Sequence, residues 1–204
     1  MQETFPDFFA QAPVLRVRDP LAQFLGAAAD GYLEYHYVDA VRLAGHSCPT
    51  VAGAYLLTLR GLRALYGDEL PERGGIEVQM RDARDNGTTG VIAAVATLLT
   101  GAAAETGFGG IGAMGRFRRR GLLSFDAPIR GLMALARVDN GARVELELNA
   151  GVVPFPAEMQ VLMPLAVSGR ADAAELARFG ELWQSRVQAM LLEHADDAEM
   201  LQIL

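Results

Sequence analysis

Lysine is absent from the 204-residue sequence, in which all 18 basic residues are arginines. Without a lysine amine, the chain has no Schiff-base nucleophile and no attachment point for pyridoxal phosphate. It also lacks the phosphate-binding lysine of a P-loop and any lysine general base. Enzyme classes that depend on such a lysine are therefore excluded.

Cysteine is nearly absent as well, because Cys48 is the only one in the sequence. A single cysteine cannot form an internal disulfide bond. It also cannot supply an all-cysteine zinc site or a cysteine-ligated iron–sulfur cluster within one chain. These structural devices are excluded.

Long apolar runs and an excess of positive charge are missing too. The longest apolar run, residues 91–99, is interrupted only by Thr97 and is too short to span a bilayer. The net charge of −7 disfavours nonspecific binding of nucleic acid. The first residues lack a basic segment followed by an apolar stretch, so no secretory signal is predicted. We expect a cytoplasmic protein with neither a nucleic-acid partner nor a membrane partner.

What the sequence does have is enough apolar residues, 51% of the chain, for a full core. Apolar periodicity and turn signals predict helices at 21–29, 50–66, 90–104 and 171–194, and strands at 33–37, 75–81, 116–125, 133–138 and 143–148. Residues 38–44 are expected to form a short helix or a turn. Asn140-Gly141 is typical of a tight hairpin between the last two strands. This order predicts an α+β fold, a mixed β-sheet with helices packed on one face.

Prolines and helix periodicity suggest the division of the chain. Pro6, Pro13 and Pro20 predict that residues 1–20 are an irregular lead-in. Residues 21–170 are expected to form the α+β domain, with a connection marked by three prolines, Pro154, Pro156 and Pro164. Residues 171–204 are predicted to form a C-terminal helix that packs on this domain or on a dimer partner.

The sequence Gly45-His46-Ser47-Cys48-Pro49 is the strongest candidate for a functional site. Proline is favoured at the first position of a helix, which places Cys48 near the N-cap and His46 in the preceding loop. The partial positive charge at a helix start favours the thiolate form of cysteine. The pair is interpreted as zinc-type ligands, as a Cys48 nucleophile with His46 as its base, or as a structural buried cysteine.

The Gly-His-Ser-Cys-Pro motif, followed by the small residues of 51–54, resembles the Gly-His-x-Cys-Pro-Gly stretch of the FmdE-like family, whose members are similar to one of the subunits of formylmethanofuran dehydrogenase. The similarity covers about residues 35–125. It implies an FmdE-like α+β fold, a metal site that uses His46 and Cys48, and a homodimer. The implied function is binding, delivery or regulation around a metal or cofactor, with zinc or another divalent transition metal as the ion. The apolar tail, residues 200–204, is a further argument for the homodimer.

The chain departs from the family pattern in ways that leave the ligand set open. Thr50 stands where the family has glycine, and residues 85–90 contain no cysteine where family members often carry one. Three alternatives follow: the metal is held by fewer protein ligands, Asp and Asn oxygens replace sulfur, or the site binds something else. His36, in the aromatic strand expected at 33–37, is a candidate third ligand, and the alternative interpretation is a half-buried strand residue.

Arginines at alternate positions form a second candidate site. On the strand expected at 116–125, Arg116, Arg118 and Arg120 would share one face and bind the carboxylate or phosphate of a small anionic ligand. Ion pairs with acidic residues are the alternative explanation. Together with the glycine-rich segment 106–115, these arginines allow a third functional hypothesis: a noncatalytic binder of an anionic metal-containing cofactor such as a tetrapyrrole.

Overall fold

A computed structural model of the chain describes residues 3–204. Its α-helices are α1 (Pro20–Phe24), α2 (Tyr37–Ala44), α3 (Pro49–Tyr66), α4 (Thr89–Thr100), α5 (Met159–Val167) and α6 (Ala173–Gln188). Its strands are β1 (Leu15–Arg18), β2 (Tyr32–Tyr35), β3 (Ile76–Met80), β4 (Leu123–Ser124), β5 (Met133–Arg137), β6 (Arg143–Leu148) and β7 (Leu201–Ile203). Short 3-10 turns, Asp7–Gln11 and Ala150–Val152, and one π turn, Ala189–Glu193, complete the elements.

The larger sheet has five strands in the order β4-β3-β5-β6-β7. β4 pairs parallel with β3, and the remaining neighbours pair antiparallel, so the sheet is mixed. The hairpin predicted around Asn140-Gly141 joins β5 to β6. β1 and β2 form a separate antiparallel sheet of two strands.

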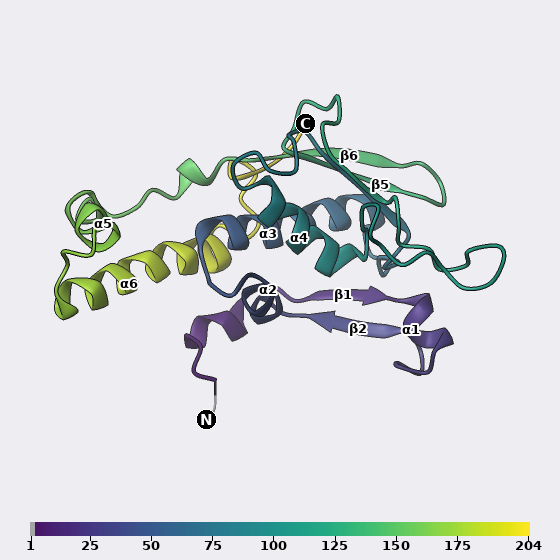
Figure 1. Ribbon diagram of the computed structural model, residues 1–204, viewed down its shortest axis with the longest axis horizontal. Coiled ribbons are helices and arrows are strands. Elements are labelled where there is room, and N and C mark those ends of the chain that lie inside the picture. Colours follow the sequence, from purple (N-terminus) through teal and green to yellow (C-terminus); the bar gives the residue numbers. More distant parts are fainter. Residues whose placement is uncertain (1–2) are drawn as a thin grey trace.

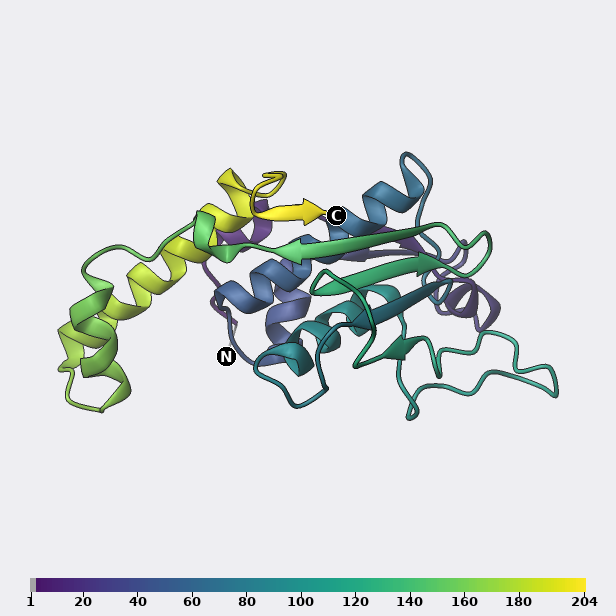
Figure 2. The same cartoon turned by 90° about the horizontal axis from the view of Figure 1, so that it is seen from above.

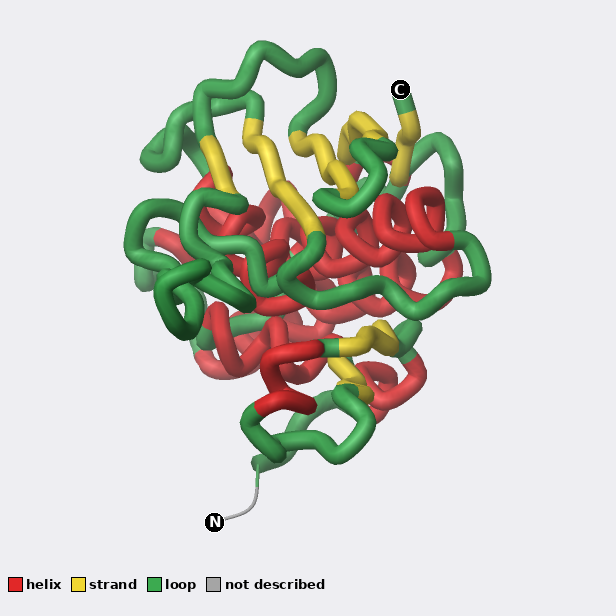
Figure 3. Tube along the Cα trace, turned by 90° about the vertical axis from the view of Figure 1, so that its right-hand side faces the viewer, coloured by secondary structure: helices red, strands yellow, loops and turns green. Residues whose placement is uncertain are grey.

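The elements lie in three layers (Figures 1 and 3). The five-stranded sheet forms one outer layer, the helices α3 and α4 lie beneath one of its faces, and the β1–β2 sheet, with α2 beside it, lies beyond these two helices. Strand β3 alternates accordingly, with Ile76, Val78 and Met80 buried and Glu77 exposed on the opposite face. The predicted α+β class, with helices on one face of a mixed sheet, is confirmed.

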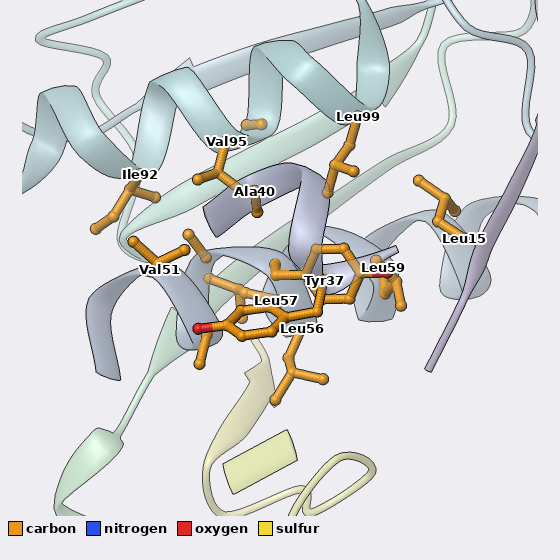
Figure 4. Close-up of a cluster of buried hydrophobic side chains, with 14 of the residues drawn as sticks. Leu15, Tyr37, Ala40, Val51, Leu56, Leu57, Leu59, Ile92, Val95 and Leu99 are labelled. Carbon is orange, nitrogen blue, oxygen red and sulfur yellow. The ribbon is translucent and has the colours of Figure 1, made fainter. Parts of the chain in front are cut away.

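Helix α3 occupies the centre of this arrangement. Tyr55, Leu56 and Leu57 are all at most 1% exposed, because α3 is covered by the sheet on one side and by α2 and α4 on others. Figure 4 shows α3 and α4 side by side, with Val51 facing Ile92 at their N-terminal ends. The two helices therefore start at the same end of the molecule.

The N-terminal segment is more ordered than its prolines suggest. The prediction of an irregular lead-in was wrong for residues 15–18, which form β1 and pair with β2 in the register Leu15↔Tyr35 to Arg18↔Tyr32. Leu15 and Val17 point into the core while Arg16 and Arg18 are exposed, a strand alternation of only four residues. The helix predicted at 21–29 is shorter and ends at Phe24.

The connection expected around the three prolines contains a helix, α5, with Pro164 inside it. This helix packs against α6 through a small apolar cluster that includes Met159, Leu162 and Leu182. Viewed from above, α5 and the first part of α6 project sideways from the three layers (Figure 2). We call this pair, residues 159–188, the helical arm.

The apolar tail, residues 200–204, packs against the rest of its own chain. Met200 and Leu201 are fully buried, and β7 adds an edge strand to the sheet by pairing Leu201 with Leu148 and Ile203 with Leu146. Only the last side chains, Ile203 and Leu204, remain nearly half exposed. The tail is therefore a weaker argument for a dimer than its sequence suggests.

Candidate functional site

The segment 45–49 forms the turn between α2 and α3. Gly45 has a φ of 76° in the left-handed region, which ends α2 and redirects the chain. Cys48 is the N-cap of α3 and Pro49 is its first residue, as the sequence predicts. The motif therefore lies where the free N–H groups of a long helix converge.

The Cys48 thiol is held directly at this helix end. Its Sγ accepts a hydrogen bond from the backbone N–H of Val51 at 3.4 Å, in place of the usual oxygen of a capping side chain. The residue is 8% exposed. The sulfur is thus fixed at the N-terminal end of α3.

His46 lies beside it on the exposed side of the turn. Its Nδ1 is 2.9 Å from the carbonyl oxygen of Ala44, and because a carbonyl oxygen only accepts, the imidazole must donate from Nδ1. In the neutral ring, this arrangement leaves the lone pair on Nε2. Metal-bound histidines in proteins use the same device, in which a backbone carbonyl fixes the second ring nitrogen.

Ser47, between these two residues, fixes the turn to the helical arm. Its hydroxyl donates to Oε1 of Gln184 at 3.0 Å, and its carbonyl oxygen accepts from the indole N–H of Trp183 and from Nε2 of Gln184, both at 3.1 Å. Because the single Ser47 proton goes to Gln184, the hydroxyl of Tyr37, 2.9 Å away, donates to Ser47. Burial raises the pKa of Tyr37, which keeps this donor protonated.

These partners of Ser47 cannot be found from the sequence pattern. Trp183 and Gln184 lie 136 and 137 residues further along the chain, on a helix whose periodicity indicates only an apolar face. Tyr37, fully buried against Phe9 and Tyr55, begins α2 instead of ending a strand. Long-range packing brings these side chains together around the turn.

His36 does not join His46 and Cys48. The strand β2 ends at Tyr35, and His36 is the N-cap of α2, where its backbone N–H donates to Asp39 at 2.8 Å. Its ring lies 3.8 Å from the carboxylate of Glu34. The eight residues of α2 separate it from His46 by about 12 Å of helix. Within residues 3–204, no three His, Cys, Asp or Glu side chains are grouped closely enough to hold a metal ion.

The arginine segment is a loop, so the prediction of a strand over 116–125 was wrong except for Leu123 and Ser124. Phe117 has a φ of 64°, which a strand does not allow. Arg116 and Arg118 line one pocket, whereas Arg120 donates from Nε to the carbonyl oxygen of Gly107. The three side chains therefore do not share one face.

A buried ion network that the sequence pattern does not reveal lies next to this loop. Asp19, 3% exposed, binds Nη1 of Arg73 at 2.9 Å and Nη2 of Arg119 at 2.7 Å. Asp19 also caps α1 by accepting the N–H groups of Leu21 and Ala22. Arg119 is drawn inward by this carboxylate, which explains why the loop leaves the extended path expected from its alternating arginines.

No family model matches the chain, and a search of curated proteins finds no match. The similarity to FmdE-like proteins thus rests on the motif at 45–49 and remains an expectation. None of the helices within residues 3–204 has both the length and the apolar character needed to cross a membrane.

Proposed function

We propose that this protein binds a divalent transition-metal ion, zinc in the first place, through Nε2 of His46 and Sγ of Cys48. The observation that carries the proposal is the hydrogen bond from His46 to the carbonyl oxygen of Ala44, because it leaves Nε2 as the basic nitrogen of an exposed ring. Cys48, two residues later and with its Sγ at the N-terminal end of α3, supplies the second donor.

The donor chemistry fits zinc, which accepts imidazole nitrogen and thiolate sulfur. A structural zinc site has four protein ligands, and these two residues supply only half of that number. The remaining positions are therefore open to water or to groups of a bound molecule. An open site of this kind fits binding, delivery or regulation, and an ion held there would act as a Lewis acid on what binds to it.

A thiol enzyme, with Cys48 as nucleophile and His46 as base, draws support from the same hydrogen bond from Val51. The burial of Cys48 distinguishes the two functions. A residue that is only 8% exposed is reached by a small ion more easily than by a bulky electrophile. Burial therefore favours the metal-binding function.

The test is metal binding by the wild type and by three variants. Cys48→Ser keeps an oxygen that caps α3, so it removes the sulfur ligand while the fold is retained. His46→Ala removes the imidazole from an exposed position, and His36→Ala is the matched control at the other end of α2. We expect about one zinc per chain in the wild type, a loss of affinity of about a hundredfold or more in both site variants, and no change in the control.

Cobalt substitution gives an independent measurement. Cobalt bound to a thiolate has a strong sulfur-to-metal absorption band, which Cys48→Ser should abolish. Equal zinc affinity in the wild type and the Cys48→Ser/His46→Ala double variant would overturn the proposal. Fast alkylation of Cys48 at mildly acidic pH in a protein that binds no metal would establish the thiol-dependent function in its place.

We also propose that the protein is a homodimer, as the resemblance implies. Supporting this, the helical arm exposes Val161, Val167 and Leu176 at 66%, 80% and 49%, away from the main core. We expect a dimer mass by light scattering, and a monomer mass for the Val161→Glu/Val167→Glu variant. Val138→Glu, at an exposed valine beyond β5, should stay dimeric. A monomeric wild type would contradict this proposal.

A further inference from the structure

A pocket of about 420 Å³ is lined by five arginines: Arg18, Arg73, Arg116, Arg118 and Arg119. It lies where the end of β1, the segment before β3 and the 116–119 loop meet. The other lining residues are Pro20, Glu72, Gly74 and Phe117. We call this the arginine pocket. In a chain with a net charge of −7, so many guanidinium groups in one place need a specific explanation.

Carboxylates neutralise only part of this charge. Arg73 and Arg119 share the single carboxylate of Asp19. Arg18 bonds to the neutral amide of Gln23 at 3.3 Å, and in the described part of the chain neither Arg116 nor Arg118 has a carboxylate within 4 Å. Glu72 is the one acidic residue of the wall. The pocket therefore carries an uncompensated positive charge, which attracts anions.

One buried donor in this cluster is unsatisfied. Nη1 of Arg119 has no hydrogen-bond partner among residues 3–204, although its side chain is only 9% exposed. It adjoins Gly74, which belongs to the pocket wall. A buried N–H group without a partner costs free energy, so such groups in native proteins require an explanation. An oxyanion bound beside Gly74 would provide the missing acceptor.

Aromatic rings hold Arg116, one of the exposed arginines of the pocket. The guanidinium of Arg116 lies 4.6 Å from the ring centroid of Phe117 and 5.5 Å from that of Phe24. Phe117 holds its place with a φ of 64°, an unfavourable conformation for a bulky side chain. The pocket thus combines guanidinium donors with an apolar wall, which suits an anion that has an organic part.

We infer that the arginine pocket binds a small organic anion with at least two negative charges, carried by phosphate or carboxylate groups. Guanidinium groups pair with both through forked N–H···O bonds. The pocket is distinct from the His46–Cys48 turn. Gly74 bonds to the carbonyl oxygen of Thr100 at the C-terminal end of α4, whereas Cys48 begins α3 at the opposite end of the two parallel helices (Figure 4).

The test is calorimetric titration of the metal-free wild-type protein, at low ionic strength, with pyrophosphate, citrate and inorganic phosphate. We expect pyrophosphate or citrate to bind more tightly than phosphate, because several guanidinium groups favour the higher charge. Tighter binding of pyrophosphate would assign the site to phosphorylated ligands, and tighter binding of citrate would assign it to polycarboxylates. Failure of all three probes to bind at millimolar concentration would overturn the proposal.

Variants locate the binding. Arg116→Gln and Arg118→Gln change exposed side chains, so the fold is expected to survive, which circular dichroism checks. Each should weaken binding by about tenfold or more. Arg130→Gln is the matched control, because this arginine is exposed but lies outside the pocket. A similar loss in the control would reveal nonspecific attraction and refute the site.

Discussion

Replacement of Asp19 with asparagine is expected to lower the free energy of unfolding by about 3 kcal/mol or more, because it leaves the guanidinium of Arg119 buried without an opposing charge. Asparagine keeps an oxygen that can cap α1 through Leu21 and Ala22. Asp19→Ala removes that cap as well and should cost about 1 kcal/mol more. Urea unfolding of the three proteins at neutral pH measures both differences.

The pH dependence of the free energy of unfolding separates the contribution of the Asp19 charge from that of its packing. Burial alone would raise the pKa of Asp19, but the N–H of Ala22 and the guanidinium groups of Arg73 and Arg119 outweigh it and hold the pKa below its ordinary value. A lowered pKa contributes stability that is present above the unfolded-state value, about 3.9, and is lost as the pH falls through the folded-state value. The difference between wild type and Asp19→Asn should therefore shrink below about pH 4.

An exposed ion pair serves as the control for this measurement. Hydrogen bonding to Arg84 lowers the pKa of Glu105 to about 2, yet this pair lies in solvent. Glu105→Gln should change stability little, because water screens exposed pairs. A loss as large as that of Asp19→Asn, or a difference for Asp19→Asn that stays constant down to pH 3, would contradict the assigned role of the buried carboxylate.

The features predicted correctly from the sequence are those that local physics determines. Pro49 at the first turn and Cys48 before it predict the start of α3, and Asn140-Gly141 predicts the β5–β6 hairpin. In both cases the deciding interactions lie within a few residues. The fold class was predicted correctly as well, because the order of long periodic segments can be recognised in the sequence even where their exact ends cannot.

The features that were missed depend on partners far away in the chain. β1 and β7 have only four and three residues, and each becomes a strand because a neighbour pairs with it. α5 forms around Pro164 because Met159 and Leu162 bury themselves against α6. The 116–120 segment alternates like a strand, but pairing of Arg119 with Asp19, 100 residues earlier, bends it into a loop.

The same distinction holds for the two candidate sites. The spacing of His46 and Cys48 is local, so the turn that holds them could be predicted. The contacts of Ser47 with Trp183 and Gln184 could not, and neither could the meeting of Arg18 and Arg73 with Arg116 and Arg118. A stretch of arginines indicated an anion site, but only the fold shows which of them converge.

Gly74→Ala is expected to be among the most destabilising single-methyl additions in this chain. Gly74 has a φ of 90°, and a Cβ there would overlap the Nη1 atom of Arg119. Because Arg119 is buried and tied to Asp19, its guanidinium cannot swing into solvent without breaking the network. We expect a loss of about 3–5 kcal/mol, the range for disrupting a buried ion pair, measured by urea unfolding.

Gly45→Ala is the matched control. Gly45 has a similar φ of 76°, but a Cβ there would meet nothing within 4 Å. Its substitution isolates the backbone cost of a left-handed residue, about 1–2 kcal/mol. If the two alanine variants lose equal stability, the clash with Arg119 contributes nothing and the rigidity assigned to the network is wrong.

A double-mutant cycle tests whether Gly74 and Asp19 act on the same side chain. Gly74 leaves room for Nη1 of Arg119, and Asp19 binds Nη2 of the same guanidinium. Asp19→Asn removes the ion pair that ties the Arg119 guanidinium in place, so the buried guanidinium can shift more easily away from the methyl group added by Gly74→Ala. The combined loss should therefore fall short of the sum by about 1 kcal/mol or more, whereas independent sites would add. A coupling of this sign would show that Gly74 and Asp19 both act through the position of Arg119, whose fixed guanidinium is what a preorganised anion pocket requires.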